Sequence, residues 1–307
     1  MIDILMATYN GEEFIKEQLD SIISQRYTDW RLIISDDCSK DDTVSIIKKY
    51  QKQYPEKILL FENDEPSGSA QNNFFNAIKY TTSDYVMFSD QDDVWLPDKI
   101  ENTFNKMMEM EKAYGQNTPV LIHTDLKVVD RNLKTINDSL FKMMNMDSKR
   151  CAFNNLLVQN IVTGCTVMGN RALFNHLEKI PKNAVMHDMW IALIASAFGK
   201  IGFVDKSTML YRQHGNNSVG AKDTKSLNYV LEKISNIQKV RNSLAKQYKQ
   251  SEEFREIYKD MLSKLQLDIL ESYSSFGEKN CMEKYSELKK YKLFKKNSLH
   301  VLGQIFV

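Results

Sequence analysis

The stretch that decides the expected fold is Ser89-Asp90-Gln91-Asp92-Asp93-Val94-Trp95. Residues 85–88 before it form a short apolar run typical of a buried strand, and residues 96–100 after it carry a Pro and an Asp that suit the first turn of a helix. Three carboxylates are therefore predicted in a turn at the carboxyl end of a strand, where open α/β sheets bind their ligands. Carboxylates this close repel one another, so the expected partner is a cation, first of all a divalent metal ion.

A helix cap and a calcium-binding loop are the alternatives for this acidic turn. Acidic residues often cap the helix that follows them, and the turn alone leaves that explanation open. An EF-hand is excluded because Val94 and Trp95 stand where its fifth ligand and its glycine belong, although Glu101 occupies the twelfth position. The rest of the chain has to decide between a cap and a metal site.

Strands and helices alternate through the first hundred residues. Apolar runs predict strands at residues 2–7, 30–34, 58–62 and 85–88, and helical spacing predicts helices at residues 14–23, 42–54 and 70–80. This alternation with short connections indicates a parallel sheet with right-handed crossovers. Three of these strands are followed by polar residues, at Thr8 to Asn10, Asp36-Asp37 and Asp90 to Asp93. The carboxyl ends of parallel strands meet at one edge of a sheet, so we expect these residues to share one crevice.

The following region is less regular and predicts a mixed sheet. A long helix is expected at residues 97–114 and an apolar helix at residues 188–198. Strands are expected at residues 120–125, 127–130, 165–169, 201–204 and 208–211. A polar loop at residues 212–218 closes this region, and we expect the first domain to end near residue 220.

Composition excludes several classes of protein. The 307 residues carry 41 Lys and Arg against 40 Asp and Glu, so the net charge of +1 gives no global attraction to nucleic acid. The N-terminus lacks the basic start of a signal peptide, and no apolar run is long enough to span a bilayer. The cysteines show no paired spacing for disulfides or zinc, which fits a reducing cytoplasm: Cys38, Cys151, Cys165 and Cys281.

The composition changes after about residue 221. Apolar residues recur at helical spacing over 230–244 and again over 254–269, which predicts two amphipathic helices joined near Ser251 in an antiparallel hairpin. Five lysines between residues 289 and 296 then precede an apolar tail at 299–307. This pairing suits contact with an anionic membrane surface, and it equally suits a solvated terminal helix. Residues 221–307 are therefore predicted as a separate helical region whose membrane contact stays open.

Three motifs in this order resemble the signature of the family 2 glycosyltransferases. They are Met6-Ala7-Thr8-Tyr9-Asn10-Gly11, Asp36-Asp37-Cys38-Ser39-Lys40-Asp41-Asp42-Thr43 and Ser89-Asp90-Gln91-Asp92-Asp93. The resemblance covers about residues 1–220 and implies the GT-A fold, a Rossmann-like α/β mixed sheet flanked by helices, here with a C-terminal helical extension. It divides the catalytic domain into a nucleotide-sugar half of about residues 1–100 and an acceptor half of about residues 101–220. It also implies an inverting transferase that uses a nucleotide-sugar donor.

The acidic turn is then expected to hold a metal ion beside the donor diphosphate. A divalent cation stabilises the charge that a nucleoside diphosphate gains as it leaves. We predict Asp92 as the direct ligand and Asp90 as the partner of the donor ribose or of a metal-bound water. His214 is either a further ligand or a structural loop histidine. Hard oxygen ligands favour Mg²⁺ or Mn²⁺.

The ends of the other strands are expected to bind the nucleotide. An ionised Asp36 or Asp37 would accept a hydrogen bond from a pyrimidine N–H and discriminate against purines, and the resemblance favours Asp36. Arg212 is predicted to contact phosphate. The remaining donor-side residues implied by the resemblance are Thr8, Tyr9, Asn10, Glu12 and Gln91.

Asp188 is the residue that the resemblance matches to the catalytic base. An inverting transfer needs a carboxylate that takes the proton from the attacking acceptor hydroxyl. Asp188 stands just before an apolar helix, so a helix N-cap is the alternative. Trp190 is expected either to stack on a sugar face or to fill the core. The predicted border of the acceptor pocket is formed by His187, Gly164 and Asp125.

A finer resemblance concerns the transferred sugar. The acidic turn, residues 187–190 and residues 211–217 are together similar to bacterial rhamnosyltransferases of cell-surface polysaccharide assembly. This implies transfer of L-rhamnose from dTDP-rhamnose to a lipid-linked glycan at the inner face of the membrane. A different sugar from a UDP donor is the alternative, and a nucleotide-sugar-binding protein without turnover is the alternative outside enzymes. Formation of a homodimer stays open.

Overall fold

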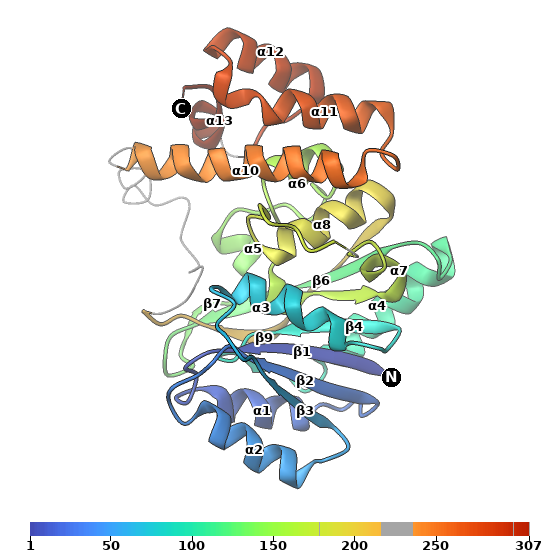
Figure 1. Cartoon of the computed structure of the whole chain (residues 1–307), viewed down its shortest axis with the longest axis vertical. Coiled ribbons are helices and arrows are strands. Elements are labelled where there is room, and N and C mark those ends of the chain that lie inside the picture. The colour runs from blue at the N-terminus through green and yellow to red at the C-terminus, as the bar shows by residue number, and fades with distance from the viewer. Residues whose placement is uncertain (178, 216–235, 297, 307) are drawn as a thin grey trace.

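The computed structural model describes residues 1–177, 179–215, 236–296 and 298–306. The described strands form one nine-stranded mixed sheet in the order β3-β2-β1-β4-β8-β6-β9-β5, with β7 paired to β6 (Figure 1). The strands are β1 Ile2–Thr8, β2 Trp30–Asp36, β3 Ile58–Glu62, β4 Tyr85–Ser89, β5 Val94–Trp95, β6 Val120–Val129, β7 Thr135–Asn137, β8 Met168–Asn170 and β9 Lys200–Arg212. The helices are α1 Ile15–Ile23, α2 Thr43–Gln53, α3 Ala70–Ala77, α4 Lys99–Tyr114, α5 Leu140–Met143, α6 Phe153–Val158, α7 Arg171–Phe174, α8 His187–Phe198, α10 Ile237–Tyr258, α11 Lys264–Ser274, α12 Cys281–Tyr291 and α13 Ser298–Phe306.

The parallel half of the sheet forms as predicted. β1 lies between β2 and β4 and runs parallel to both, and β2 runs parallel to β3. The connections between these strands pass through α1, α2 and α3 in turn. Both faces of such a sheet are covered by helices, which is why the strand sequences are almost continuously apolar. The turns that follow Thr8, Asp36 and Ser89 therefore lie at the same edge of the sheet.

The other half of the sheet has longer strands than predicted. β6 and β9 are each continuous where the sequence suggested two short strands. Val204 and Ser207 of β9 pair with the consecutive residues Thr124 and Asp125 of β6, so two polar residues of β9 are looped out in a bulge. These polar residues suggest a loop in the sequence, but the bulge absorbs them without ending the strand. The elements β5, β7, α5, α6 and α7 were not predicted, because two to six residues are too few to show a periodicity.

Helices cover both faces of the sheet (Figure 1). Ile4 and Met6 of β1 share one core with residues of α1, α2 and α4. Leu5 lies in a second core with residues of α3, α6 and α8, as the alternation of side chains along a strand requires. This second core continues through Phe254 of α10 and Leu270 of α11. The C-terminal helices thus pack on the α6 and α8 side of the sheet, at the top of Figure 1.

The C-terminal hairpin turns later than predicted. α10 runs unbroken through Ser251, whose hydroxyl donates to the Gln247 carbonyl one helical turn earlier. The chain turns at residues 259–263, and α11 begins at a capping box formed by Ser263 and Gln266. The predicted domain boundary near residue 220 and the first part of the predicted helix over 230–244 lie outside the described residues. Among the described helices, none is both long and apolar enough to cross a membrane.

Candidate active site

The turns after β1 and β2 are joined by hydrogen bonds. The Thr8 hydroxyl donates to the Asp36 carboxylate over 2.8 Å. The Asn10 N–H donates to the Ser39 hydroxyl over 2.9 Å, and the Lys40 N–H donates to the Asn10 side chain over 2.8 Å. Asn10 has a φ of 46°, a left-handed conformation that Asn adopts more readily than most residues. The two predicted nucleotide-binding turns therefore form one connected unit.

Gln91 ties the acidic turn to the turn after β1. Its side-chain amide accepts from the Tyr9 N–H over 2.9 Å and donates to the Tyr9 carbonyl over 3.0 Å. Gly11 lies against this amide, and a Cβ there would stand 2.4 Å from Gln91 Oε1. The motif thus needs glycine for close approach. The Tyr9 side chain itself is 54% exposed at this edge.

Both carboxylates of the second motif accept hydrogen bonds from the protein. Asp36 accepts from the Thr8 hydroxyl and also from the N–H and the hydroxyl of Ser39. Asp37 accepts from the N–H and the hydroxyl of Ser67 and from the Asn63 amide. Both residues are buried and shape their turns. Recognition of a nucleobase by Asp36 or Asp37 stays a prediction.

Thr8 and Glu12 also hold these turns. Thr8 is 1% exposed, which corrects the prediction that it lines the nucleotide. The Glu12 carboxylate accepts from the Asp42 N–H over 2.8 Å, and the Glu12 N–H donates to the Asp41 carboxylate over 3.0 Å. Glu12 is exposed, and its contact with the donor stays a prediction.

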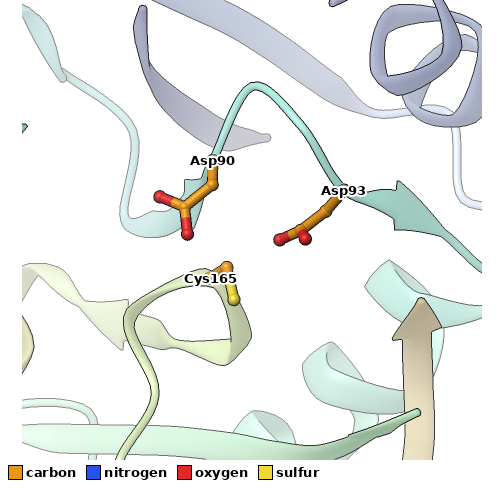
Figure 2. A group of neighbouring side chains, drawn as sticks. All are labelled: Asp90, Asp93 and Cys165. Atoms are coloured by element: carbon orange, nitrogen blue, oxygen red, sulfur yellow. The ribbon is translucent and has the colours of Figure 1, made fainter. Parts of the chain in front are cut away.

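Two carboxylates of the acidic turn meet a buried thiol. Figure 2 shows Asp90 and Asp93 directed toward Cys165, and one ligand atom from each lies within 4.8 Å of the others. Burial, followed by the charges of Asp92 and Asp188, raises the pKa of Asp90 to about 7. Burial and the charges of Asp92 and Asp90 raise the pKa of Asp93 well above its usual range. A cation at this turn would oppose both shifts, because positive charge favours the ionised carboxylate.

Asp93 does not cap the helix that follows, so the helix cap that the acidic turn alone left open is not observed at this residue. It is fully buried, and its Oδ1 accepts from the Arg212 N–H over 3.1 Å. α4 instead begins after Asp98. Asp93 therefore anchors the acidic turn to the end of β9.

The two predicted metal ligands lie together. Asp92 Oδ2 and His214 Nε2 are 2.7 Å apart, although 122 residues separate them in the chain. Phe14 packs against the imidazole, with 4.9 Å between the ring centroids. The side chains of Asp92 and His214 are 17% and 9% exposed. A carboxylate oxygen and an imidazole nitrogen that converge at an accessible point fit a divalent cation.

Arg212 supports this pair through bonds within the protein, and its contact with a phosphate stays a prediction. Its side chain is 2% exposed. The guanidinium donates to the carbonyls of Asp92 and Arg131 and to the Glu17 carboxylate. It also stacks 4.6 Å from the centroid of the Phe14 ring. Arg212 therefore fixes the backbone that carries Asp92.

Asp188 lies in the first turn of α8 and is held by three hydrogen bonds. Its carboxylate accepts from the Gly164 N–H over 3.0 Å, the Asn160 amide over 3.2 Å and the Met189 N–H over 2.6 Å. Burial raises the pKa of Asp188 to about 6, and these bonds limit the rise. The N-cap residue of α8 is Met186, so the alternative of Asp188 as the N-cap is not observed. A carboxyl with such a pKa is ionised at neutral pH and still basic enough to accept a proton.

Two residues predicted on the acceptor side are part of the core. Trp190 is fully buried and packs against Phe254 with 5.1 Å between ring centroids, so of its two predicted roles the core role is the one observed. His187 is 3% exposed and packs on Phe74 with 4.3 Å between ring centroids. Burial lowers the pKa of His187 to about 3, so its ring is neutral. Neither side chain presents a surface to an acceptor.

Asp125 and Gly164 have positioning roles. Asp125 is 5% exposed and accepts a hydrogen bond from the Ser139 hydroxyl at the start of α5, so it does not border an open pocket as predicted. Gly164 lies beneath His187, and a Cβ there would stand 2.7 Å from the imidazole Nε2. Because its N–H binds the Asp188 carboxylate, this close packing sets the position of Asp188.

Two further residues of the site were not predicted. Gln18 in α1 supports the acidic turn: its amide is hydrogen-bonded to the Ser89 hydroxyl over 2.7 Å. With the amide turned over, its nitrogen also donates to the Asp93 carbonyl over 2.7 Å and its oxygen accepts from the Trp95 indole N–H over 3.1 Å. Asn160 orients Asp188. Gln18 had a signal in the sequence, since it interrupts the apolar stripe of α1, whereas Asn160 lies in a segment without any periodic pattern.

The mixed sheet, with helices on both faces and three joined turns after its strands, forms a GT-A fold. The chain belongs to glycosyl transferase family 2, whose family model matches residues 3–177. The predicted family and fold are thereby confirmed.

Curated relatives are similar over most of their length. The dTDP-rhamnosyl transferase RfbG of Shigella flexneri is 34% identical over 230 residues, which cover 70% of this chain and 74% of RfbG. The UDP-Glc:alpha-D-GlcNAc-diphosphoundecaprenol beta-1,3-glucosyltransferase WfgD of Escherichia coli is 26% identical over 195 residues, which cover 63% of this chain and 70% of WfgD.

Solved structures share the fold. Residues 1–349 of TarS from S. aureus, in complex with UDP-GlcNAc, superpose with a TM-score of 0.55 at 16% identity, covering 90% of this chain and 80% of that one. In another TarS structure the match spans 43% of the TarS chain. The mannosyltransferase PcManGT from Pyrobaculum calidifontis, in complex with GDP-Man and Mn²⁺, superposes with a TM-score of 0.55 at 16% identity, covering 99% and 83%.

Proposed function

We propose that the protein transfers a sugar from a nucleotide-sugar donor to a glycan acceptor with inversion at the anomeric carbon, and that Asp188 is the base. The observation that carries this proposal is that two consecutive residues link Asp188 to the acidic turn: the Gly164 N–H donates to the Asp188 carboxylate over 3.0 Å, and the Cys165 thiol lies within 4.8 Å of ligand atoms of Asp90 and Asp93. After burial and Asp92, the charge of Asp188 contributes to raising the pKa of Asp90 to about 7. This supports a single space shared by the donor diphosphate and the acceptor hydroxyl.

A divalent metal ion is part of the proposal, with Asp92 and His214 as the residues that would hold it. The imidazole favours Mn²⁺ over Mg²⁺, because Mn²⁺ accepts nitrogen ligands more readily. The group of Asp90, Asp93 and Cys165 fits less well: burial raises the pKa of the Cys165 thiol well above its usual range, and a protonated thiol is a poor ligand. When bound, the ion would stabilise the negative charge on the leaving diphosphate.

The residues of the chain account for the proton. In the proposed transfer the acceptor oxygen forms a bond to the anomeric carbon while the bond from that carbon to the donor phosphate oxygen breaks. The nucleoside diphosphate leaves with the electrons of that bond, and Asp188 takes the proton of the acceptor hydroxyl. The Gly164 N–H and the Asn160 amide orient the carboxylate for this step.

For the donor we propose dTDP-rhamnose, which is supported by the similarity to RfbG. A UDP-sugar is the second candidate, supported by WfgD, which is named for UDP-Glc, and by the TarS complex with UDP-GlcNAc. For the acceptor we propose a lipid-linked glycan of cell-surface polysaccharide synthesis, since WfgD is named for a diphosphoundecaprenol-linked acceptor. The cytoplasmic face of the membrane is where such an acceptor would meet the donor.

A screen of nucleotide sugars tests this function. The protein is mixed with dTDP-rhamnose, UDP-glucose, UDP-GlcNAc or GDP-mannose in Mn²⁺ or in EDTA, and both the melting temperature and donor hydrolysis are measured. We expect dTDP-rhamnose with Mn²⁺ to give the largest rise in melting temperature, because a ligand that binds only the folded state stabilises it. A larger rise in melting temperature with a UDP-sugar would show that the UDP-sugar, and not dTDP-rhamnose, is the donor. No response to any nucleotide sugar would refute the proposal.

Variants test the metal role and the alternative of binding without turnover. Asp92→Asn should abolish the rise that depends on Mn²⁺, whereas Asp84→Asn, at an exposed position outside the site, should keep it. Binding that is indifferent to EDTA and to Asp92→Asn would remove the metal from the proposal. A metal-dependent rise without hydrolysis or transfer to any acceptor would favour a nucleotide-sugar-binding protein.

A further inference from the structure

A cavity of about 220 Å³ lies between the segments that follow α5 and α6 and the C-terminal helices. One wall comes from the segments that follow α5 and α6, and the other from α10 and from the chain between α12 and α13. Its lining residues are Met144, Asn145, Met146, Val158, Gln159, Asn160, Gln247, Lys295, Lys296 and His300.

The lining of the cavity is basic. Lys295, Lys296 and His300 contribute to one wall, and none of the described lining residues is acidic. Lys296 Nζ donates to the Met146 carbonyl over 3.0 Å, a neutral acceptor that leaves the ammonium charge uncompensated. A concave surface that carries charge of one sign concentrates ions of the opposite sign. The cavity therefore favours an anion.

The cavity adjoins the proposed base. Asn160 lines it, and the same Asn160 amide donates to Asp188 Oδ1 over 3.2 Å and to the Val162 carbonyl over 2.8 Å. One side chain therefore separates the cavity from the carboxylate. An anion bound there would lie one side chain away from Asp188.

The basic wall is held in place against α6 and the residue that follows it. The Asn154 amide donates to the carbonyls of Tyr291 and Lys292 over 3.2 and 3.0 Å. The Lys296 N–H donates to Gln159 Oε1 over 2.9 Å, across 137 residues of sequence. The cavity is thus built by contacts between two distant parts of the chain.

We propose that this cavity binds the phosphate or diphosphate group through which the acceptor glycan is attached to its lipid. The inference rests on the proposed function and deepens it by naming the acceptor group that is recognised. Lys295, Lys296 and His300 would pair with the phosphate oxygens, and the amides of Gln159 and Gln247 would donate hydrogen bonds. The sugar next to the phosphate then lies where its hydroxyl reaches Asp188. A volume of about 220 Å³ suits this group, since one water molecule takes up about 30 Å³ in the liquid.

Equilibrium binding of phosphate probes tests the proposal without turnover. The full chain is titrated with inorganic pyrophosphate and with farnesyl diphosphate in EDTA, which also removes the proposed metal-dependent binding of a diphosphate at the acidic turn. The test variant is Lys295→Gln with Lys296→Gln. The matched control is Lys289→Gln with Lys292→Gln, which removes the same charge from two exposed residues of the same basic segment that do not line the cavity.

We expect both probes to bind the wild-type chain and the control with Kd values within about twofold of each other. In the test variant the Kd should rise at least about tenfold, as expected for the loss of two charge-assisted contacts. Thermal unfolding of both variants shows that they fold. Equal binding by the two variants, or no binding to the wild type, would overturn the proposal.

Two further measurements separate other outcomes. Binding to phosphatidylglycerol vesicles without binding to either soluble probe would overturn the proposal, because the basic segment would then meet a headgroup surface and not an acceptor phosphate. Donor-dependent melting and hydrolysis are measured on the same variants. If these donor responses persist while the phosphate probes fail to bind, this inference fails and the proposed function stands; if the donor responses are absent from the wild type, the proposed function itself fails.

Discussion

Two regions of the molecule are built in different ways: the turns after β1, β2 and β4, called the donor edge after their proposed role, and the cavity beside the C-terminal helices. At the donor edge, three turns that each follow a strand are joined by hydrogen bonds. Examples are the bond between Asn10 and Ser39 and the two bonds between Gln91 and Tyr9. At the cavity, two distant parts of the chain meet, and Gln159 binds the backbone of Lys296. The first site consists of local motifs, whereas the second exists only after the C-terminal helices have packed on the sheet. A sequence motif therefore reveals a site of the first kind far more readily than a site of the second kind.

The largest expected effect comes from Asp188→Asn, which removes the proposed base and keeps the shape of the side chain. The transfer rate should fall by about 10²–10⁴-fold, the usual contribution of a general base. Donor affinity, measured by titration, should change less than about twofold, because the donor edge lies on other elements. Asp205→Asn, in the exposed bulge of β9, is the control and should keep full activity. Full transfer by Asp188→Asn would assign the base to another residue.

The pH dependence of the transfer rate should report the ionisation of Asp188. Burial raises the pKa of Asp188 to about 6, and the base works only when ionised. The value of kcat/KM for the acceptor should therefore level off above pH 6 and fall about tenfold per pH unit below it.

Asn160→Ala sharpens this test. The variant removes a hydrogen bond that lowers the pKa of Asp188, so the acidic limb should move to higher pH. A rate that stays flat down to pH 4.5, or a limb that does not move in Asn160→Ala, would contradict the assignment.

Gly11→Ala examines the joined turns of the donor edge. The new methyl group would displace the Gln91 amide and break its two bonds to Tyr9, which should lower the free energy of unfolding by about 1 kcal/mol. In a Gln91→Ala background the same change should cost less than about 0.5 kcal/mol, because the obstructing amide is gone. Urea denaturation of the four proteins measures this coupling. Additive losses would show that Gly11 is required for some other reason.

The smallest effect concerns membrane contact through the C-terminal tail, which stays a prediction. Leu302 and Phe306 of α13 are 51% and 64% exposed, so Leu302→Ser with Phe306→Ser should roughly halve the fraction of protein that floats with anionic liposomes. Met282→Ser serves as the control, since Met282 is 84% exposed on α12. Equal flotation of all three proteins would favour the alternative of a solvated terminal helix.

Most of the catalytic fold was predictable because its elements show their own periodicity. β1 to β4 and α1 to α4 each carry an apolar pattern long enough to recognise. The convergence of Asp92 and His214 was expected from two motifs and is seen in the distance between them. The bulge of β9 was not foreseen, since a bulge and a loop look alike in a single sequence.

The roles of individual polar residues were harder to predict. Arg212 and Asp125 were expected to face ligands, but both bind groups of the protein that would otherwise be buried without a partner. Which backbone carbonyls need a donor depends on how distant segments pack, so one sequence does not reveal it. Asn160 was missed for the same reason, since its importance follows from its contact with Asp188.

The basic wall of the cavity is held chiefly by its main chain. The Asn154 amide binds two carbonyls of the segment 291–296, Arg150 binds the Phe294 carbonyl, and Gln159 accepts the Lys296 N–H. Side chains at several of these positions are therefore under little constraint from docking, and substitutions there can alter the lining while the segment keeps its place. Exchanging this short segment between relatives would be a route to new acceptor preferences on an unchanged donor site.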